Sequence, residues 1–82
     1  MQTLPTETLG ARIRRIRKAT LIKHNGKQNP MTQELLAALA GCDKGTISRI
    51  ERNVQQPGIK ILQAIALALK VTLEILLGFT IA

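Results

Sequence analysis

The chain contains very little of what catalytic and metal sites are made from. Its 82 residues include one cysteine, one histidine and one phenylalanine, and it has no tryptophan or tyrosine. A single cysteine excludes an intramolecular disulfide, and with one histidine it cannot build a zinc site. The five acidic residues are scattered and supply no catalytic dyad or triad, so we expect neither an enzyme nor a cofactor.

Long hydrophobic runs are also missing. No apolar stretch approaches the roughly 20 residues that a membrane-spanning helix needs. The N-terminus lacks the basic region and apolar core that mark a secretory signal. We therefore expect a cytoplasmic protein with no membrane partner.

Negative charge is scarce. The chain has 5 Asp and Glu against 12 Lys and Arg, which gives a formal net charge of +7. Such an excess is typical of a protein that binds a polyanion, although basic surfaces also simply keep proteins soluble. The excess is concentrated near the N-terminus, because residues 1–30 carry seven Lys or Arg and one Glu, whereas residues 31–56 carry three of each sign.

The pattern of apolar and capping residues predicts an all-α fold. Five helices are expected. The first begins near Thr6 or Glu7, and the other four cover about residues 32–40, 43–53, 59–69 and 72–77. They form one small domain over residues 1–82, with a core over about 7–77 and a tail over 78–82. In the first helix an apolar stripe leaves four basic residues facing solvent or phosphate: Arg12, Arg14, Arg15 and Lys18.

Residues 32–52, TQELLAALAGCDKGTISRIER, predict two short helices joined by a tight turn. Thr32 and Asp43 stand at N-cap positions, and Gly41 can end the first helix in the left-handed conformation. That helix should bury one stripe, made of Leu35, Leu36, Leu39 and Ala40.

The spacing inside this segment is specific. Counted from Gln33, a small residue stands at position five (Ala37), and branched apolar residues stand at positions fifteen and eighteen (Ile47 and Ile50). Two helices that cross at about 90 to 120° need these residue types, because the small side chain lets the backbones approach and the isoleucines fill the angle. The segment resembles the helix-turn-helix of the phage repressor and Cro family of transcription factors, and the resemblance covers roughly residues 9–78. It implies a compact five-helix, lambda-repressor-like DNA-binding domain.

The resemblance also implies which residues read DNA bases. They lie on the exposed N-terminal part of the second helix of the motif and are Lys44, Gly45, Ser48 and Arg49. Arginine and lysine can donate to the O6 and N7 acceptors of guanine, which supports two of these independently. Two alternatives stay open: Arg49 contacts phosphate only, and Gly45 is a tolerated surface glycine.

Phosphate contacts would position the domain rather than specify sequence. The helix N-terminus at Thr32 offers free amides to an anion. The resemblance implies that Gln33 contacts the DNA backbone and braces the second helix of the motif. The full set of candidates is Thr32, Gln33, Thr46, Arg52, Asn53 and Gln55. By the same resemblance, Arg17 and Glu51 occupy the places of a partly buried ion pair, so we interpret them as structural.

Family members usually dimerise through their C-terminal region. The corresponding partner surface here is Leu73, Ile75, Leu76, Phe79 and Ile81, although such residues also form ordinary core or tail. The expected function is a dimeric transcriptional regulator, a repressor, bound to a palindromic operator in double-stranded DNA. The competing interpretation is an antitoxin or transcription adaptor that binds a protein partner, because fold alone does not settle function.

Residues 21–31, LIKHNGKQNPM, depart from the family pattern. They lengthen the connection between the first two helices, so that Arg17 and Gln33 stand 16 positions apart. We interpret this insertion as a flexible surface loop, since loops tolerate insertions at little cost. The alternatives are a longer first helix or a basic wing against neighbouring phosphates.

Overall fold

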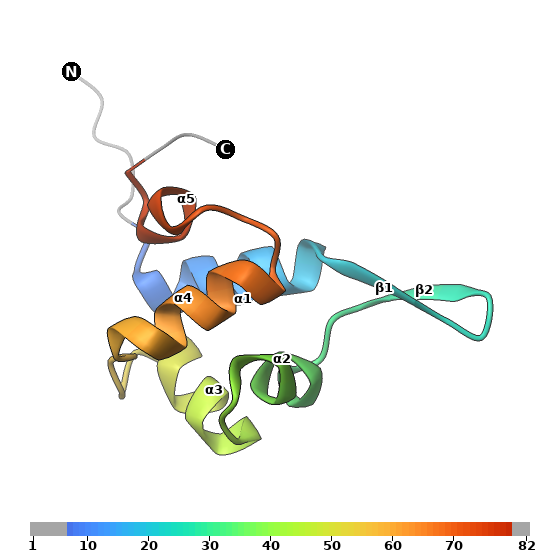
Figure 1. Ribbon diagram of the computed structural model, residues 1–82, viewed down its shortest axis with the longest axis horizontal. Coiled ribbons are helices and arrows are strands. Elements are labelled where there is room, and N and C mark those ends of the chain that lie inside the picture. The colour runs from blue at the N-terminus through green and yellow to red at the C-terminus, as the bar shows by residue number, and fades with distance from the viewer. Residues whose placement is uncertain (1–6, 80–82) are drawn as a thin grey trace.

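The computed structural model describes residues 7–79, which form five helices and one hairpin (Figure 1). The elements in chain order are α1 (Leu9–Ala19), β1 (Leu21–His24), β2 (Lys27–Pro30), α2 (Gln33–Ala40), α3 (Lys44–Glu51), α4 (Ile59–Ala68) and α5 (Leu73–Leu77). The all-α prediction is confirmed for the body of the domain, with a small two-stranded sheet added to it. No helix in the described range is long and apolar enough to cross a membrane.

Helix boundaries follow the capping residues. The hydroxyls of Thr8, Thr32 and Thr72 accept hydrogen bonds from the amides three residues later and so begin α1, α2 and α5. The predicted start of the first helix was therefore too early: Glu7 precedes the cap, and Thr6 lies outside the described residues.

The insertion over residues 21–31 is a β-hairpin, so the prediction of a flexible loop was wrong. The two strands pair antiparallel from Leu21 with Pro30 to His24 with Lys27. Asn25 and Gly26 make the connection with φ of 53° and 76°, the positive values of the two-residue turn that matches strand twist. Pro30 fits because a two-stranded sheet has only edge strands, where a missing N–H is tolerated.

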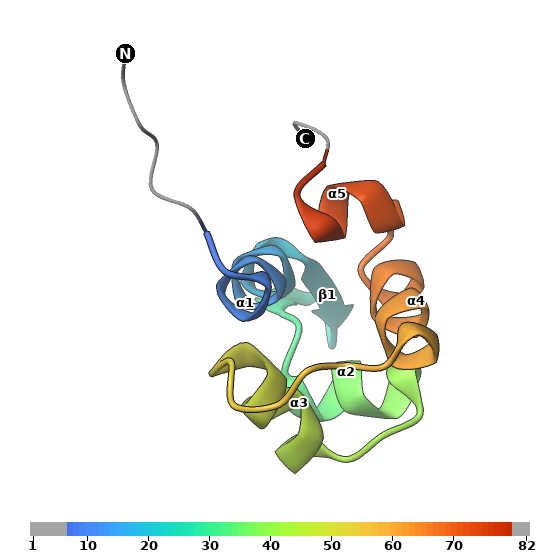
Figure 2. The same cartoon turned by 90° about the vertical axis from the view of Figure 1, so that its left-hand side faces the viewer.

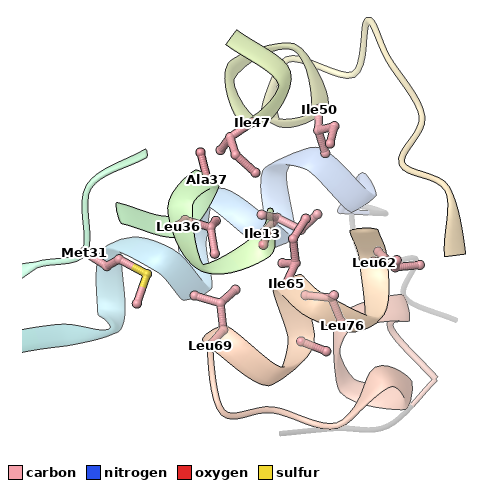
Figure 3. Close-up of a cluster of buried hydrophobic side chains, with 12 residues drawn as sticks. Ile13, Met31, Leu36, Ala37, Ile47, Ile50, Leu62, Ile65, Leu69 and Leu76 are labelled. Atoms are coloured by element: carbon pink, nitrogen blue, oxygen red, sulfur yellow. The ribbon is translucent and has the colours of Figure 1, made fainter. Parts of the chain in front are cut away.

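The core lies between the helices (Figure 3). Its fully buried large side chains are Ile13, Leu36, Ile47, Ile50, Ile65 and Leu76. The stripe predicted for α2 was partly wrong, because Leu39 is 54% exposed whereas Ala37 is buried against the second helix of the motif. The apolar face of α2 is therefore centred on Leu36, Ala37 and Ala40.

Contacts between the helices define the body. Helix α2 packs against α3 and α4, and α1 packs against α3 and α5. Viewed from the side, α2 and α3 lie at the edge opposite α5, with α1 and α4 between them (Figure 2). The hairpin extends away from this body (Figure 1).

Candidate nucleic-acid interface

The corner between α2 and α3 is built by caps at both ends. Gly41 closes α2 with a φ of 76°, and its amide bonds back to the carbonyls of Ala37 and Ala38. Asp43 opens α3, because its Oδ1 accepts the backbone N–H of Thr46 at 2.7 Å. Hydrogen bonding from Thr46, through its side chain and its amide, lowers the pKa of Asp43 and keeps the carboxylate charged. The charge of Arg49 lowers it further.

Helix α3 turns Ile47 and Ile50 into the core and presents its other side to solvent. The four predicted base-reading residues lie together on this outward side: Lys44 and Arg49 are exposed, and Gly45 and Ser48 are half-buried. Lys44 lies 3.9 Å from Glu34 of α2, a surface ion pair that contributes little to stability. Its ammonium group is therefore available for another partner.

Arg49 lies along its own helix. Its Nε donates to Oε1 of Gln55 at 2.8 Å, and its Nη2 donates to Oγ1 of Thr46 at 3.3 Å. A Cβ added at Gly45 would meet Nη1 of Arg49 at 3.1 Å, so the glycine leaves room for the guanidinium to pass. Two predicted phosphate contacts, Thr46 and Gln55, thus orient the predicted base-reading arginine.

A groove beside α3 brings together three helices. It has a volume of about 350 Å³ and is lined by Arg14, Gln33, Ser48, Glu51 and Arg52. Gln33 stands in the first turn of α2, whose leading amides are free to meet an anion. Two exposed arginines and this helix N-terminus make the groove suited to phosphate.

A buried ion pair holds the walls of that groove. Arg17 and Glu51 are 7% and 6% exposed and are joined by two hydrogen bonds, of 2.7 and 3.1 Å. Arg17 also donates to the carbonyl of Met31 at 2.7 Å, and Gln33 donates to Glu51 at 2.9 Å. The pair therefore ties α1 to α3, as expected, and Gln33 braces α3 from the start of α2.

Asn53 has a structural environment that its prediction as a phosphate contact did not anticipate. Its φ is 63°, its side-chain oxygen accepts the N–H of Gly10 at 3.0 Å, and its side-chain nitrogen donates to Thr8 at 2.9 Å. A Cβ at Gly10 would clash with the carbonyl oxygen of Ile50, so α1 touches the end of α3 directly. Asn53 fastens this contact, and its side chain is already engaged.

The basic residues of α1 divide into two groups. Arg12 bonds to the carbonyl of Leu76 and to Glu7, and its side chain is only 15% exposed. Arg15 forms two hydrogen bonds to the carboxylate of Glu7, of 2.8 and 3.1 Å. Arg14 instead lines the groove. Helical periodicity could not distinguish these three arginines, because all of them lie outside the apolar stripe.

The residues of the predicted partner surface differ in how exposed they are. Leu76 is completely buried within the domain, and Leu73 and Ile75 are half-buried. Phe79 is 79% exposed, while Ile81 lies outside the described residues. Sequence patterning did not indicate Leu67 of α4, which is 80% exposed.

Residues 7–79 bring no three His, Cys, Asp or Glu side chains close enough to hold a metal ion. Cys42 lies half-buried in the turn before α3. Burial, and secondarily the charge of Asp43, raises the pKa of its thiol, which disfavours the reactive thiolate.

The fold and the corner define a helix-turn-helix domain. The model of the helix-turn-helix family matches residues 27–76, more than half of the chain. The chain therefore belongs to this family of DNA-binding transcriptional regulators, which is not enzymatic. No curated protein sequence matches the chain.

Several solved structures share the fold. The P22 c2 repressor, in complex with a synthetic operator, is 28% identical with a TM-score of 0.75 over 92% of this chain and 100% of that one. The restriction-modification controller protein C.AhdI from Aeromonas hydrophila is 26% identical with a TM-score of 0.70, over 83% and 86%. SinR, a master regulator for biofilm formation in complex with DNA, is 32% identical with a TM-score of 0.71, over 87% and 100%. SinR also occurs in a complex with the protein SinI.

Proposed function

We propose that this chain binds double-stranded DNA in a sequence-specific manner as a dimeric repressor. In this proposal α3 enters the major groove, and Lys44, Ser48 and Arg49 contact base edges while Gly45 permits close approach. The observation that carries the proposal is the placement of these four residues on one outward side of α3, beside the free N-terminus of α2.

Phosphate contacts would flank that helix. The groove lined by Arg14, Gln33 and Arg52 lies next to Ser48, so a DNA strand held there would position α3 over the bases. The likeness to the P22 c2 repressor and to SinR, which are solved with an operator and with DNA, supports this arrangement. A twofold dimer would hold its two reading helices about 34 to 36 Å apart and so would recognise a palindrome.

The test is selection of bound sites from random DNA, followed by affinity measurements at physiological salt. A specific repressor is expected to prefer its selected site over unrelated DNA by roughly 10³-fold or more. Combined Lys44→Ala and Arg49→Ala substitutions should abolish most of that preference. Combined Lys60→Ala and Lys70→Ala substitutions remove the same charge from residues outside α3 and should preserve the preference for the selected site. The proposal is wrong if no motif emerges and the α3 variant binds like the native chain.

A protein-binding role is the second candidate. The complex of SinR with SinI shows that a similar chain is found with a protein partner. Leu67 and Phe79 are large apolar side chains that are about four-fifths exposed here, and such residues are available for association. Recovery of one stoichiometric partner, together with absent DNA preference, would favour an antitoxin or adaptor.

A further inference from the structure

The hairpin of β1 and β2 carries positive charge and nothing to neutralise it. Lys23, His24 and Lys27 are all exposed near its tip, and no ion pair to either lysine occurs in the described part of the chain. The stretch 8–33 contains no Asp or Glu. Lys27 is paired with His24 on one face of the hairpin, whereas Lys23 is paired with Gln28 on the other. The tip therefore presents positive charge on both faces, outside the helix-turn-helix.

The base of the hairpin is fixed to the body. Met31 is buried, its amide donates to the carbonyl of Thr20 at 2.8 Å, and its carbonyl accepts from Arg17 at 2.7 Å. Ile22 packs against the same core. Because Arg17 also holds Glu51 of α3, the direction of the hairpin is set relative to the proposed reading helix.

The hairpin joins the interface at its edge. Strand β2 leads through Met31 directly to Thr32, the cap of α2, whose free amides are proposed to meet phosphate. Each four-residue strand is about 13 Å long at roughly 3.3 Å per residue. That length corresponds to about four base pairs at 3.4 Å each. The hairpin also extends away from α5, the region proposed for dimer contact (Figure 1).

Chemistry favours a nucleic-acid backbone over a second copy of the hairpin. Its strands are short, and lysine and proline on exposed strand edges discourage pairing with another sheet. Two identical hairpins would also repel each other, since each carries two lysines and no acid. A line of phosphates offers the opposite charge.

We propose that the hairpin is a second DNA contact, in which Lys23 and Lys27 bind the sugar-phosphate backbone flanking the site read by α3. This inference rests on the proposed DNA-binding function. The hairpin adds affinity and lengthens the footprint without reading bases, because lysine contacts to phosphate carry no sequence information.

The test measures the salt dependence of binding on two duplexes. One carries the selected site with long flanks, and the other ends at the edges of that site. On the long duplex Lys23→Gln and Lys27→Gln should each lower the slope of log affinity against log salt by about 0.9, and together by about 1.8. On the short duplex both variants should bind like the native chain.

Lys70→Gln is the matched control, since it removes the same charge from an exposed residue after α4 and should leave both slopes unchanged. An unchanged slope for the double hairpin variant on the long duplex would overturn the inference, even if the hairpin bound an acidic protein. An equal loss on both duplexes would also overturn it, because the lysines would then act through general charge. A native chain with no preferred site would instead reject the proposed function.

Discussion

Arg49, the proposed base-reading arginine, is held in place by neighbouring polar side chains in the absence of DNA. Gln55 and Thr46 hold its guanidinium against the first turn of α3, where Gly45 provides the space. A side chain that is already ordered loses less conformational entropy when it binds. The polar residues around Arg49 therefore act with it, although none of them needs to touch a base.

Gly45→Ala tests the role of the glycine. Alanine should raise stability by about 0.4 to 1 kcal/mol, because it restricts the unfolded chain and its Cβ displaces only the flexible end of Arg49. Affinity for the selected DNA site should fall, since the methyl group would occupy space needed for close approach. Thermal melts and DNA titrations check both effects. Higher stability with unchanged affinity would identify Gly45 as a tolerated surface residue.

Asp43 makes the stability of α3 depend on pH. Its pKa in the folded state is lowered by Thr46 and Arg49, so its contribution is present above the unfolded pKa and is lost as pH falls through the folded pKa. Asp43→Asn keeps a capping oxygen but does not titrate. Melting temperatures from about pH 6 to about pH 2 should show the native chain more stable at the upper end and the two chains converging in acid. Parallel curves would contradict this.

At the scale of elements, polar links decide how the helices meet. One buried pair joins α1 to α3, and the bracing glutamine joins α2 to the same carboxylate. Asn53 fastens the other end of α1 to α3. These links fix the angle at which α3 is presented, which is the quantity that a DNA groove would sense.

Arg17→Ala should destabilise the domain by about 3 to 5 kcal/mol, because Glu51 would remain buried without its partner. Arg15→Ala should melt close to the native temperature, since its pair with Glu7 is on the surface. Urea unfolding of the two variants measures the difference. Equal midpoints would show that the buried pair does not organise the fold.

Gly10→Ala should lower the melting temperature strongly, because its Cβ would clash with backbone oxygens of Ile50 and Glu51 that cannot move independently. Gly58→Ala is the matched control, since a Cβ there meets nothing within 4 Å. A small effect at Gly10 would mean that α1 can shift away from α3 at little cost.

The whole molecule has two separated ends. The basic hairpin extends from one region, and α5 lies at another (Figure 1). Phe79, which follows α5 in the chain, is exposed. In the proposed assembly, this separation would let the hairpin contact DNA flanks while α5 meets a second copy. An assembly of that kind would use charge where it meets DNA and apolar surface where it meets protein.

Phe79→Ala should shift the proposed dimer to monomer and weaken binding to a palindromic site, while the monomer fold is retained because the ring is exposed. Ile59→Ala is a suitable control, since Ile59 is 59% exposed at the start of α4 and belongs to neither proposed surface. Sedimentation at several protein concentrations measures the effect. A dimer that persists unchanged in Phe79→Ala would place the contact elsewhere.

The local chemistry of the sequence was enough to determine the corner. Helix caps and the glycine turn depend only on residues a few positions away in the chain. The caps at Thr32 and Asp43, the turn at Gly41 and the two inward isoleucines could therefore be predicted from spacing, and with them α2, α3 and the outward residues of α3. The resemblance added the pairing of Arg17 with Glu51, which periodicity alone does not predict.

Tertiary structure decided which of several similar side chains were already engaged. The hairpin was missed because Asn25 and Gly26 indicated a turn, while the short polar strands beside them carry no clear alternation. Arg12, Arg14 and Arg15 look alike along one helix, yet Glu7 and α5 engage two of them and leave the third beside the groove. Asn53 is likewise engaged by Thr8 and Gly10, and Leu76 is buried in the core, because distant segments fold against them. Sequence determines local conformation, whereas the partner of a side chain depends on which distant segments fold against it.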